Sequence, residues 1–149
     1  MELKSTVVRV RPWLHDSWST KAIFLVIAVV VLGSYYRVRS LTNLSQNWLS
    51  AQTEKNVVGL EALYCWEGVS PAERQRMRLL IAQELEYPVV RTAWVDLGEE
   101  KPNPGWRPNC TPVRGLRVEY RTDERFTVTY QIGRSGLFRY QFVVMVPEK

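Results

Sequence analysis

The chain has 149 residues, of which 46% are hydrophobic and 23% are charged. This is a globular composition, which excludes a fully disordered chain and is typical of one domain with an attached segment. The net charge of +5 does not indicate nucleic-acid binding, which needs a basic stripe over a folded surface. Instead, much of the positive charge flanks one apolar segment, with Arg9, Arg11 and Lys21 before it and Arg37 and Arg39 after it.

The apolar segment, residues 22–36, reads AIFLVIAVVVLGSYY and contains neither charge nor proline. Fifteen helical residues span about 22 Å, less than the ~30 Å hydrocarbon core of a bilayer. The flanks can supply the difference, because cations snorkel toward headgroups and aromatic rings favour the membrane interface. The sequence therefore predicts a transmembrane helix over residues 22–36, with these membrane-interface residues: Trp13, Trp18, Lys21, Tyr35, Tyr36 and Arg37.

Two other interpretations of this segment are a buried core helix and a cleaved signal peptide. Cations and aromatic residues at both ends disfavour the core helix. The sequence after the segment, GSYYRVRS, has no small-x-small cleavage site, which disfavours the signal peptide. More cations precede the span than closely follow it, so we expect residues 1–21 in the cytoplasm. The chain would then be a single-pass protein of the inner (plasma) membrane, with its C-terminal domain in the periplasm or outside the cell.

Beyond the span, apolar residues recur at helical spacing, and this pattern predicts a helical neck over residues 37–66. Gly68 ends it, and residues 67–149 form the expected domain. Ser70, Pro71 and Glu73 form a helix-start signal, with serine as N-cap, proline at the first position and glutamate three residues after the cap. The helix should run to about Glu86, before Tyr87-Pro88. The residues with helical spacing in the neck are Leu41, Leu44, Trp48, Leu49, Val57, Leu60 and Tyr64.

The C-terminal part has the alternating pattern of β-strands. Residues 89–97 predict one strand, and residues 98–111 are a loop rich in proline and glycine. Three further runs, 116–121, 126–132 and 138–146, predict an antiparallel meander with one apolar face. Val143 and Met145 lie on the opposite face of the last run, so we expect them at a protein interface. Trp106, in the loop, is a second candidate interface residue. The expected fold is an α+β membrane protein with one or two helices packed on the meander.

Cys65 and Cys110 are the two cysteines of the chain. Both follow the apolar segment, and an oxidising compartment would favour a disulfide between them. Such a bond would tie the end of the neck to the loop before the meander. The alternative is two unrelated buried thiols.

No catalytic or cofactor motif is evident in the sequence. The single histidine, His15, precedes the span, and two cysteines 45 positions apart do not make a zinc site. The carboxylates that remain as formal candidates are Glu84 with Glu86 and Glu99 with Glu100, and no phosphate-binding glycine loop is present. We therefore expect no enzyme, cofactor, metal site, small-molecule substrate or nucleic-acid partner.

The layout is loosely similar to that of pilin-like subunits, which also place a long, partly membrane-embedded helix before a small antiparallel sheet. The resemblance covers layout only, because residues 22–36 contain no acid and Ser19-Thr20-Lys21 is not a processing site. The leading hypothesis is a non-catalytic subunit or assembly factor of a cell-envelope complex, such as a secretion or pilus apparatus. Its partners would be the lipid bilayer and other membrane or periplasmic subunits. The alternatives are an accessory subunit of a respiratory or photosynthetic membrane complex, and a membrane-tethered enzyme that uses carboxylates.

Overall fold

The structure is a computed structural model that describes residues 17–98, 104–122, 126–137 and 139–148, with only the backbone described for residues 17–20. The chain divides into two compact units, and the boundary lies between Tyr35 and Tyr36. The first helix, α1, spans Ser17–Thr53 and so contributes residues to both units.

The first half of α1 is apolar and exposed. Among the described residues, α1 is the one helix long and apolar enough to cross a membrane. Every large apolar side chain between Ile23 and Leu32 is more than half exposed, and Phe24 is 72% exposed. This segment therefore has an apolar surface that its own unit leaves uncovered.

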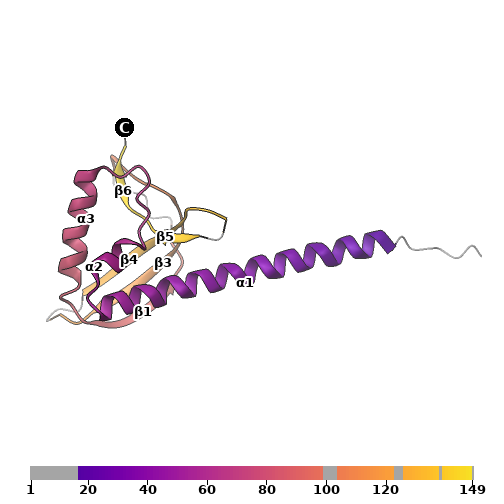
Figure 1. Cartoon of the computed structure of the whole chain (residues 1–149), viewed down its shortest axis with the longest axis horizontal. Helices are drawn as coiled ribbons and strands as arrows, with labels where there is room; N and C mark the ends of the chain where they lie inside the picture. Colours follow the sequence, from indigo (N-terminus) through magenta and orange to yellow (C-terminus); the bar gives the residue numbers. More distant parts are fainter. Residues whose placement is uncertain (1–16, 99–103, 123–125, 138, 149) are drawn as a thin grey trace, which may run out of the picture. The chain divides into compact units, whose positions relative to one another are not determined.

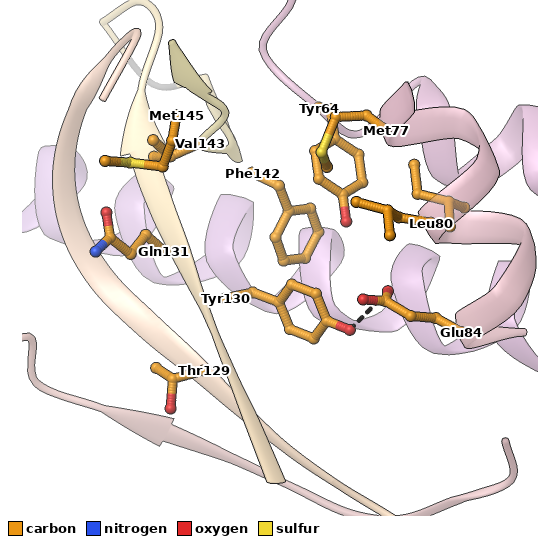
Figure 2. A pocket seen from close by; sticks show the side chains of 11 residues that line it. Tyr64, Met77, Leu80, Glu84, Thr129, Tyr130, Gln131, Phe142, Val143 and Met145 are labelled. Carbon is orange, nitrogen blue, oxygen red and sulfur yellow. Dashed lines mark hydrogen bonds between the residues drawn. The ribbon is translucent and has the colours of Figure 1, made fainter. Parts of the chain in front are cut away.

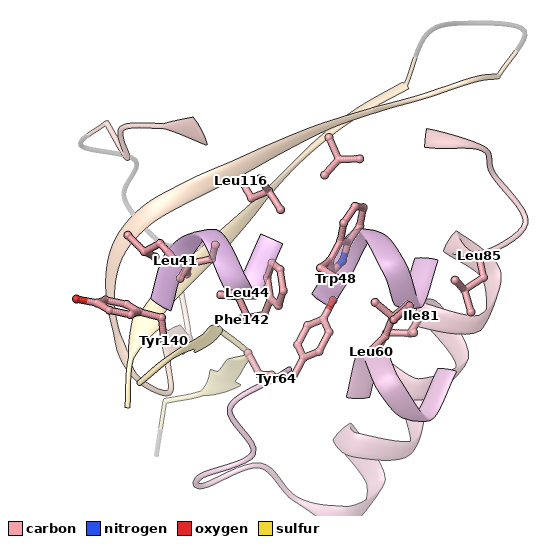
Figure 3. Packing of buried hydrophobic residues seen from close by; sticks show 14 of the residues in the cluster. Leu41, Leu44, Trp48, Leu60, Tyr64, Ile81, Leu85, Leu116, Tyr140 and Phe142 are labelled. Atoms are coloured by element: carbon pink, nitrogen blue, oxygen red, sulfur yellow. The ribbon is translucent and has the colours of Figure 1, made fainter. Parts of the chain in front are cut away.

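The second half of α1 belongs to the core of the second unit. Four side chains lie at helical spacing on one face of this half, and each is less than 10% exposed. They are Leu41, Leu44, Trp48 and Ala51. Figure 3 shows Leu41, Leu44 and Trp48 directed at the same cluster as Tyr64 and Phe142. This half of α1 is a core helix of the domain.

The chain reverses direction after Thr53 through a Schellman motif. Lys55 adopts a left-handed conformation, with φ of 52°. The Asn56 amide donates to Ala51 O at 2.8 Å, and the Lys55 amide donates to Gln52 O at 3.3 Å. Asn56 then caps helix α2, which spans Val57–Glu61. Residues 37–66, expected to form a neck, thus fold as two helices whose inner side chains are in the core.

Helix α3 spans Pro71–Glu84 and begins where the sequence predicts. The Glu73 amide donates to Ser70 Oγ at 3.2 Å, and the Ser70 amide donates to a Glu73 carboxylate oxygen at 3.0 Å, which completes the capping box. Ile81 and Leu85 are buried. Arg78 Nε lies 3.6 Å from Glu61 Oε1, and this ion pair ties α3 to α2.

The main sheet is antiparallel, with strand order β1-β3-β4-β5, and confirms the α+β class. Its register pairs Leu116 with Tyr130 and Val118 with Val128. These residues share the face that packs on α1, where the rings of Trp48 and Tyr130 are 5.8 Å apart. Figure 1 shows α2, α3 and the C-terminal half of α1 beside this sheet. The strands are Val89–Val95 (β1), Thr111–Tyr120 (β3), Phe126–Arg134 (β4) and Tyr140–Phe142 (β5).

The third run of the predicted meander, residues 138–146, is not one strand. It divides into β5 and a separate strand β6, Met145–Pro147, which pairs with β2, Trp106–Pro108. The cause is Asn109. Its backbone amide donates to Val144 O at 3.0 Å, and its Oδ1 accepts from the Val144 amide at 3.0 Å. These bonds occupy the Val144 backbone and turn the chain toward β2.

Asn109 also holds the segment between α2 and α3. Its Nδ2 donates to Cys65 O at 2.6 Å and to Glu67 O at 3.0 Å. One half-buried amide side chain therefore joins three segments that are 35 to 44 positions apart in the sequence.

We predict that Asn109→Ala lowers the free energy of unfolding by about 2–4 kcal/mol, because three side-chain hydrogen bonds are lost and their partners are left unsatisfied. Denaturant unfolding in mild detergent, followed by tryptophan fluorescence, measures this difference. The control is Asn43→Ala, which changes an exposed asparagine within α1 and should have little effect. Equal stability of the two variants would contradict the role given to Asn109.

Candidate functional site

The candidate site is a pocket of about 230 Å³ between α3, the edge of β4 and the segment around β5 and β6. Figure 2 shows the rings of Tyr64, Phe142 and Tyr130 in the middle of this pocket, between α3 on one side and the strands on the other. Its lining combines aromatic, aliphatic and thioether groups with one carboxylate. The lining residues are Tyr64, Met77, Leu80, Ile81, Glu84, Thr129, Tyr130, Gln131, Phe142, Val143 and Met145.

The sequence of α3 places the carboxylate in the pocket. Met77, Ile81 and Glu84 lie at positions i, i+4 and i+7 of the helix, so they share one face. That face is the inner one, since Ile81 is only 1% exposed. Glu84 therefore occupies a position where an apolar side chain would ordinarily be found.

Two tyrosines connect Glu84 to the core in a short hydrogen-bonded chain. Tyr130 Oη donates to Glu84 Oε2 at 2.8 Å, and the hydroxyls of Tyr120 and Tyr130 are 2.5 Å apart. Because the single hydroxyl proton of Tyr130 is directed at Glu84, Tyr120 is the donor of the second bond. The O–H bonds of Tyr120 and Tyr130 thus both point along the chain from the core toward the Glu84 carboxylate.

Burial dominates the titration of these groups, since it disfavours their charged forms. It raises the pKa of the Glu84 carboxyl above its usual value, although the Tyr130 hydrogen bond acts in the opposite direction. Burial also raises the pKa of Tyr120 to about 12. The pKa values of Tyr64 and Tyr130 are raised as well, first by burial and then by the nearby Glu84. The tyrosines are therefore neutral hydrogen-bonding groups at ordinary pH.

Glu84 has no cation beside it among the residues that the structure describes. The ion pairs described are Lys55 with Glu86 and Arg78 with Glu61, and neither includes Glu84. An ionised carboxylate accepts up to about four hydrogen bonds, and one is assigned here, from Tyr130. The pocket therefore presents an unpaired acceptor in apolar surroundings, an arrangement suited to a cationic or hydrogen-bond-donating group.

The predicted interface residues fall in two places. Val143 and Met145 are half-buried and line the pocket. Trp106 begins β2, is 38% exposed and is not part of the pocket lining. Val143, Met145 and Glu84 therefore lie in one pocket, although the sequence offered Glu84 only as a formal carboxylate candidate and did not single out Tyr130. An acidic residue at an inward position of a predicted helix was the available signal.

The predicted membrane-interface residues are described in part. Lys21, Tyr35, Tyr36 and Arg37 lie on α1, and the two tyrosine side chains are more than half exposed. Trp18 lies within the helical backbone of α1, whereas Trp13 falls outside the described residues.

The two cysteines lie close together although they are far apart in the sequence. The Cys65 amide donates to Phe142 O at 2.9 Å, which fixes Cys65 beside β5. Cys110 follows Asn109, whose side chain binds the Cys65 carbonyl. Burial, and then the neighbouring Cys65 thiol, raises the pKa of Cys110 to about 12. Gly133 leaves room for the Cys110 sulfur, since a Cβ at that position would clash with it. Both thiols are free in the structure.

The candidate carboxylate pairs are not assembled into one site within the described part of the chain. Glu84 lines the pocket, whereas the Glu86 side chain is 73% exposed and lies 3.9 Å from Lys55 Nζ. Glu99, Glu100 and His15 lie outside the described residues. Across the described ranges, no group of three or more His, Cys, Asp or Glu side chains could hold a metal ion.

Comparisons of the chain with protein-family models, with curated proteins and with solved structures found no match. The functional interpretation therefore depends on the residues themselves.

We predict that Glu84 makes stability depend on pH. Because burial raises its folded-state pKa, the stability linked to protonated Glu84 is fully present below the ordinary value of 4.5. It is lost as the pH rises through the folded-state pKa. Relative to Glu84→Gln, which is neutral throughout, the wild type should lose unfolding free energy as the pH rises above 4.5. Denaturant unfolding over a pH series measures the difference.

Glu86→Gln is the matched control for this experiment, because Glu86 is two positions away but its side chain is 73% exposed. Its difference from the wild type should vary little with pH. A pH-independent difference for Glu84→Gln would contradict the burial argument.

We also predict that Cys65 and Cys110 form a disulfide when the domain matures in an oxidising compartment. The bond would close a ring that spans 45 positions and should add about 4 kcal/mol to stability. Thiol titration of the denatured protein, purified without reductant, should find no free thiol. A Cys65→Ala, Cys110→Ala variant should match the reduced wild type in stability. Two free thiols in the unreduced protein would show that the pair stays unbonded.

Proposed function

We propose that this chain is a single-pass membrane protein that acts as a non-catalytic subunit or assembly factor of a cell-envelope complex. The observation that carries the proposal is the exposed apolar surface of α1, where Ile23 to Leu32 find no cover in their own unit. Exposed apolar surface costs about 25 cal/mol per Å² in water, and lipid removes this cost. In this proposal residues 22–36 lie in the inner membrane, residues 1–21 in the cytoplasm and the domain in the periplasm or outside the cell.

The short connection between the apolar segment and the domain supports a function close to the membrane. Tyr36 ends the apolar segment, and Leu41, five positions later, is already 5% exposed in the domain core. Even a fully extended chain of five residues reaches only about 17 Å. A protein anchored in this way would present its domain to partners at the bilayer surface.

The surface of the domain supports a binding role. The pocket lined by Val143 and Met145 opens beside the edge of β4, and Trp106 exposes part of its ring at the start of β2. Aromatic and methionine side chains are enriched in the cores of protein interfaces. The layout of anchor, helix and small antiparallel sheet favours a component of a secretion or pilus apparatus.

The test is co-purification after gentle detergent extraction, comparing the full chain with a deletion of residues 40–149 that keeps the anchor. We expect partner recovery to fall at least about tenfold with the deletion, because the proposed contacts lie on the domain. The control is that both proteins resist extraction from membranes with alkaline carbonate.

Two outcomes would contradict the proposal. Full partner recovery by the anchor alone would favour an accessory subunit of an energy-transducing complex, held through its span. Recovery of the intact chain as a soluble protein without detergent would overturn the membrane assignment itself.

A further inference from the structure

One edge of β4 is only partly covered. Along one side β4 pairs with β3 from Phe126 to Arg134, whereas along the other it pairs with β5 only from Ile132 to Arg134. In the described part of the chain, no strand pairs with the β5 side of β4 before Gln131. This edge is therefore available for pairing with another extended chain.

The direction of the backbone groups along this edge follows from one hydrogen bond. The Val143 amide donates to Gln131 O at 2.9 Å, so Gln131 directs its carbonyl to the β5 side. Along a strand, successive residues direct their N–H and C=O groups to opposite sides. Thr129, two positions before Gln131, consequently directs its N–H and C=O to the same uncovered side.

The pocket adjoins this edge. Thr129, Tyr130 and Gln131 contribute to its lining, with Glu84 on α3 opposite Tyr130 (Figure 2). Its volume of about 230 Å³ is below the roughly 300–1,000 Å³ of typical small-molecule sites. A pocket of this size beside a free strand edge suits one side chain of an added strand.

The chemistry of the pocket specifies a basic side chain. Glu84 supplies a carboxylate with no cation beside it in the described residues, so the charge of an occupant would be complementary. The rings of Tyr64 and Phe142 are 5.3 Å apart and those of Tyr130 and Phe142 are 5.8 Å apart, and aromatic faces attract cations. Apolar groups on either side can cover the methylene stem of lysine or arginine.

We propose that the edge of β4 from Phe126 to Gln131 binds an extended segment of a partner protein as an added strand, and that a lysine or arginine of that segment enters the pocket against Glu84. This inference rests on the proposed function, since it specifies how the domain recognises its partner. Addition of a strand gives affinity through main-chain hydrogen bonds, and the pocket gives specificity.

The basic residues near the N-terminus of this same chain are not the occupant. Arg9 and Arg11 precede the apolar segment of α1, and in the proposed topology they lie across the bilayer from the domain. A second copy in the same membrane has the same topology and cannot bring these two arginines to the pocket either. We therefore assign the partner segment to a different protein on the domain side.

The test uses the full chain in nanodiscs of phosphatidylcholine, a neutral lipid that does not itself retain cationic peptides. Acetylated, amidated heptapeptide mixtures carry lysine, arginine, glutamine or glutamate at the central position and mixed residues elsewhere. Bound peptides are quantified by mass spectrometry. We expect the lysine and arginine mixtures to be recovered about tenfold more than the glutamine mixture, since a desolvated ion pair is gained.

Two pairs of variants separate the parts of the proposal. Glu84→Gln should reduce the basic-to-glutamine ratio to about one, whereas Glu86→Gln should leave it unchanged. Thr129→Pro should reduce recovery of all mixtures. Proline removes the backbone N–H of residue 129, which points to the uncovered side of β4, and so breaks no hydrogen bond to β3. Thr129→Val keeps that donor and should bind like the wild type.

Any of three results would overturn the inference: equal recovery of the basic and neutral mixtures, a basic preference that survives Glu84→Gln, or binding that Thr129→Pro does not affect. The proposed function is tested separately by co-purification. If partners co-purify with the full chain and are lost when residues 40–149 are deleted, but the peptides show no preference, the proposed function stands and the domain binds its partners at another surface.

Discussion

One helix has to satisfy two different environments, and this constraint organises the rest of the molecule. From Ile23 to Leu32 the large apolar side chains of α1 are more than half exposed, and a lipid environment would cover such a surface. From Leu41 onward only one face is apolar, and that face is buried against the sheet. The change from an all-round apolar surface to a single apolar stripe occurs within one uninterrupted helix. The core of the second unit is therefore built around the C-terminal half of the same helix whose N-terminal half is apolar and exposed.

The second feature is an acid that the fold does not require. Glu84 lies on the same face of α3 as Met77 and Ile81, where leucine or methionine would pack without a desolvation cost. Its one assigned hydrogen bond comes from Tyr130, which in turn accepts from Tyr120. A purely structural role would favour a saturated network with several donors on the carboxylate, because a half-satisfied buried group costs stability. The basic side chain proposed above would complement this carboxylate, which lines the pocket without a cation beside it in the described residues.

The sequence predicted the parts of the fold that local patterns encode. The capping box at Ser70 and Glu73 is a local signal, and the structure has it. The alternation in residues 116–121 and 126–132 likewise predicted β3 and β4. The division of the last run depends instead on Asn109, whose partners Cys65, Glu67 and Val144 are 35 to 44 positions away. In the pocket, the alternation of apolar residues singled out Val143 and Met145. The hydrogen bond between Glu84 and Tyr130 joins residues 46 positions apart, and no local sequence pattern predicts such a contact.

Tyr130 connects the pocket with the C-terminal half of α1 inside the second unit. Tyr130 donates to Glu84 on one side, and on the other its ring lies 5.8 Å from that of Trp48 on α1. Trp48 is 2% exposed, so it cannot move without disturbing the core around it. Glu84, Tyr130 and Trp48 thus form a continuous series of contacts from the pocket to the C-terminal half of α1. A side chain that enters the pocket as proposed would therefore meet a wall fixed by the core of the second unit and not by a mobile loop.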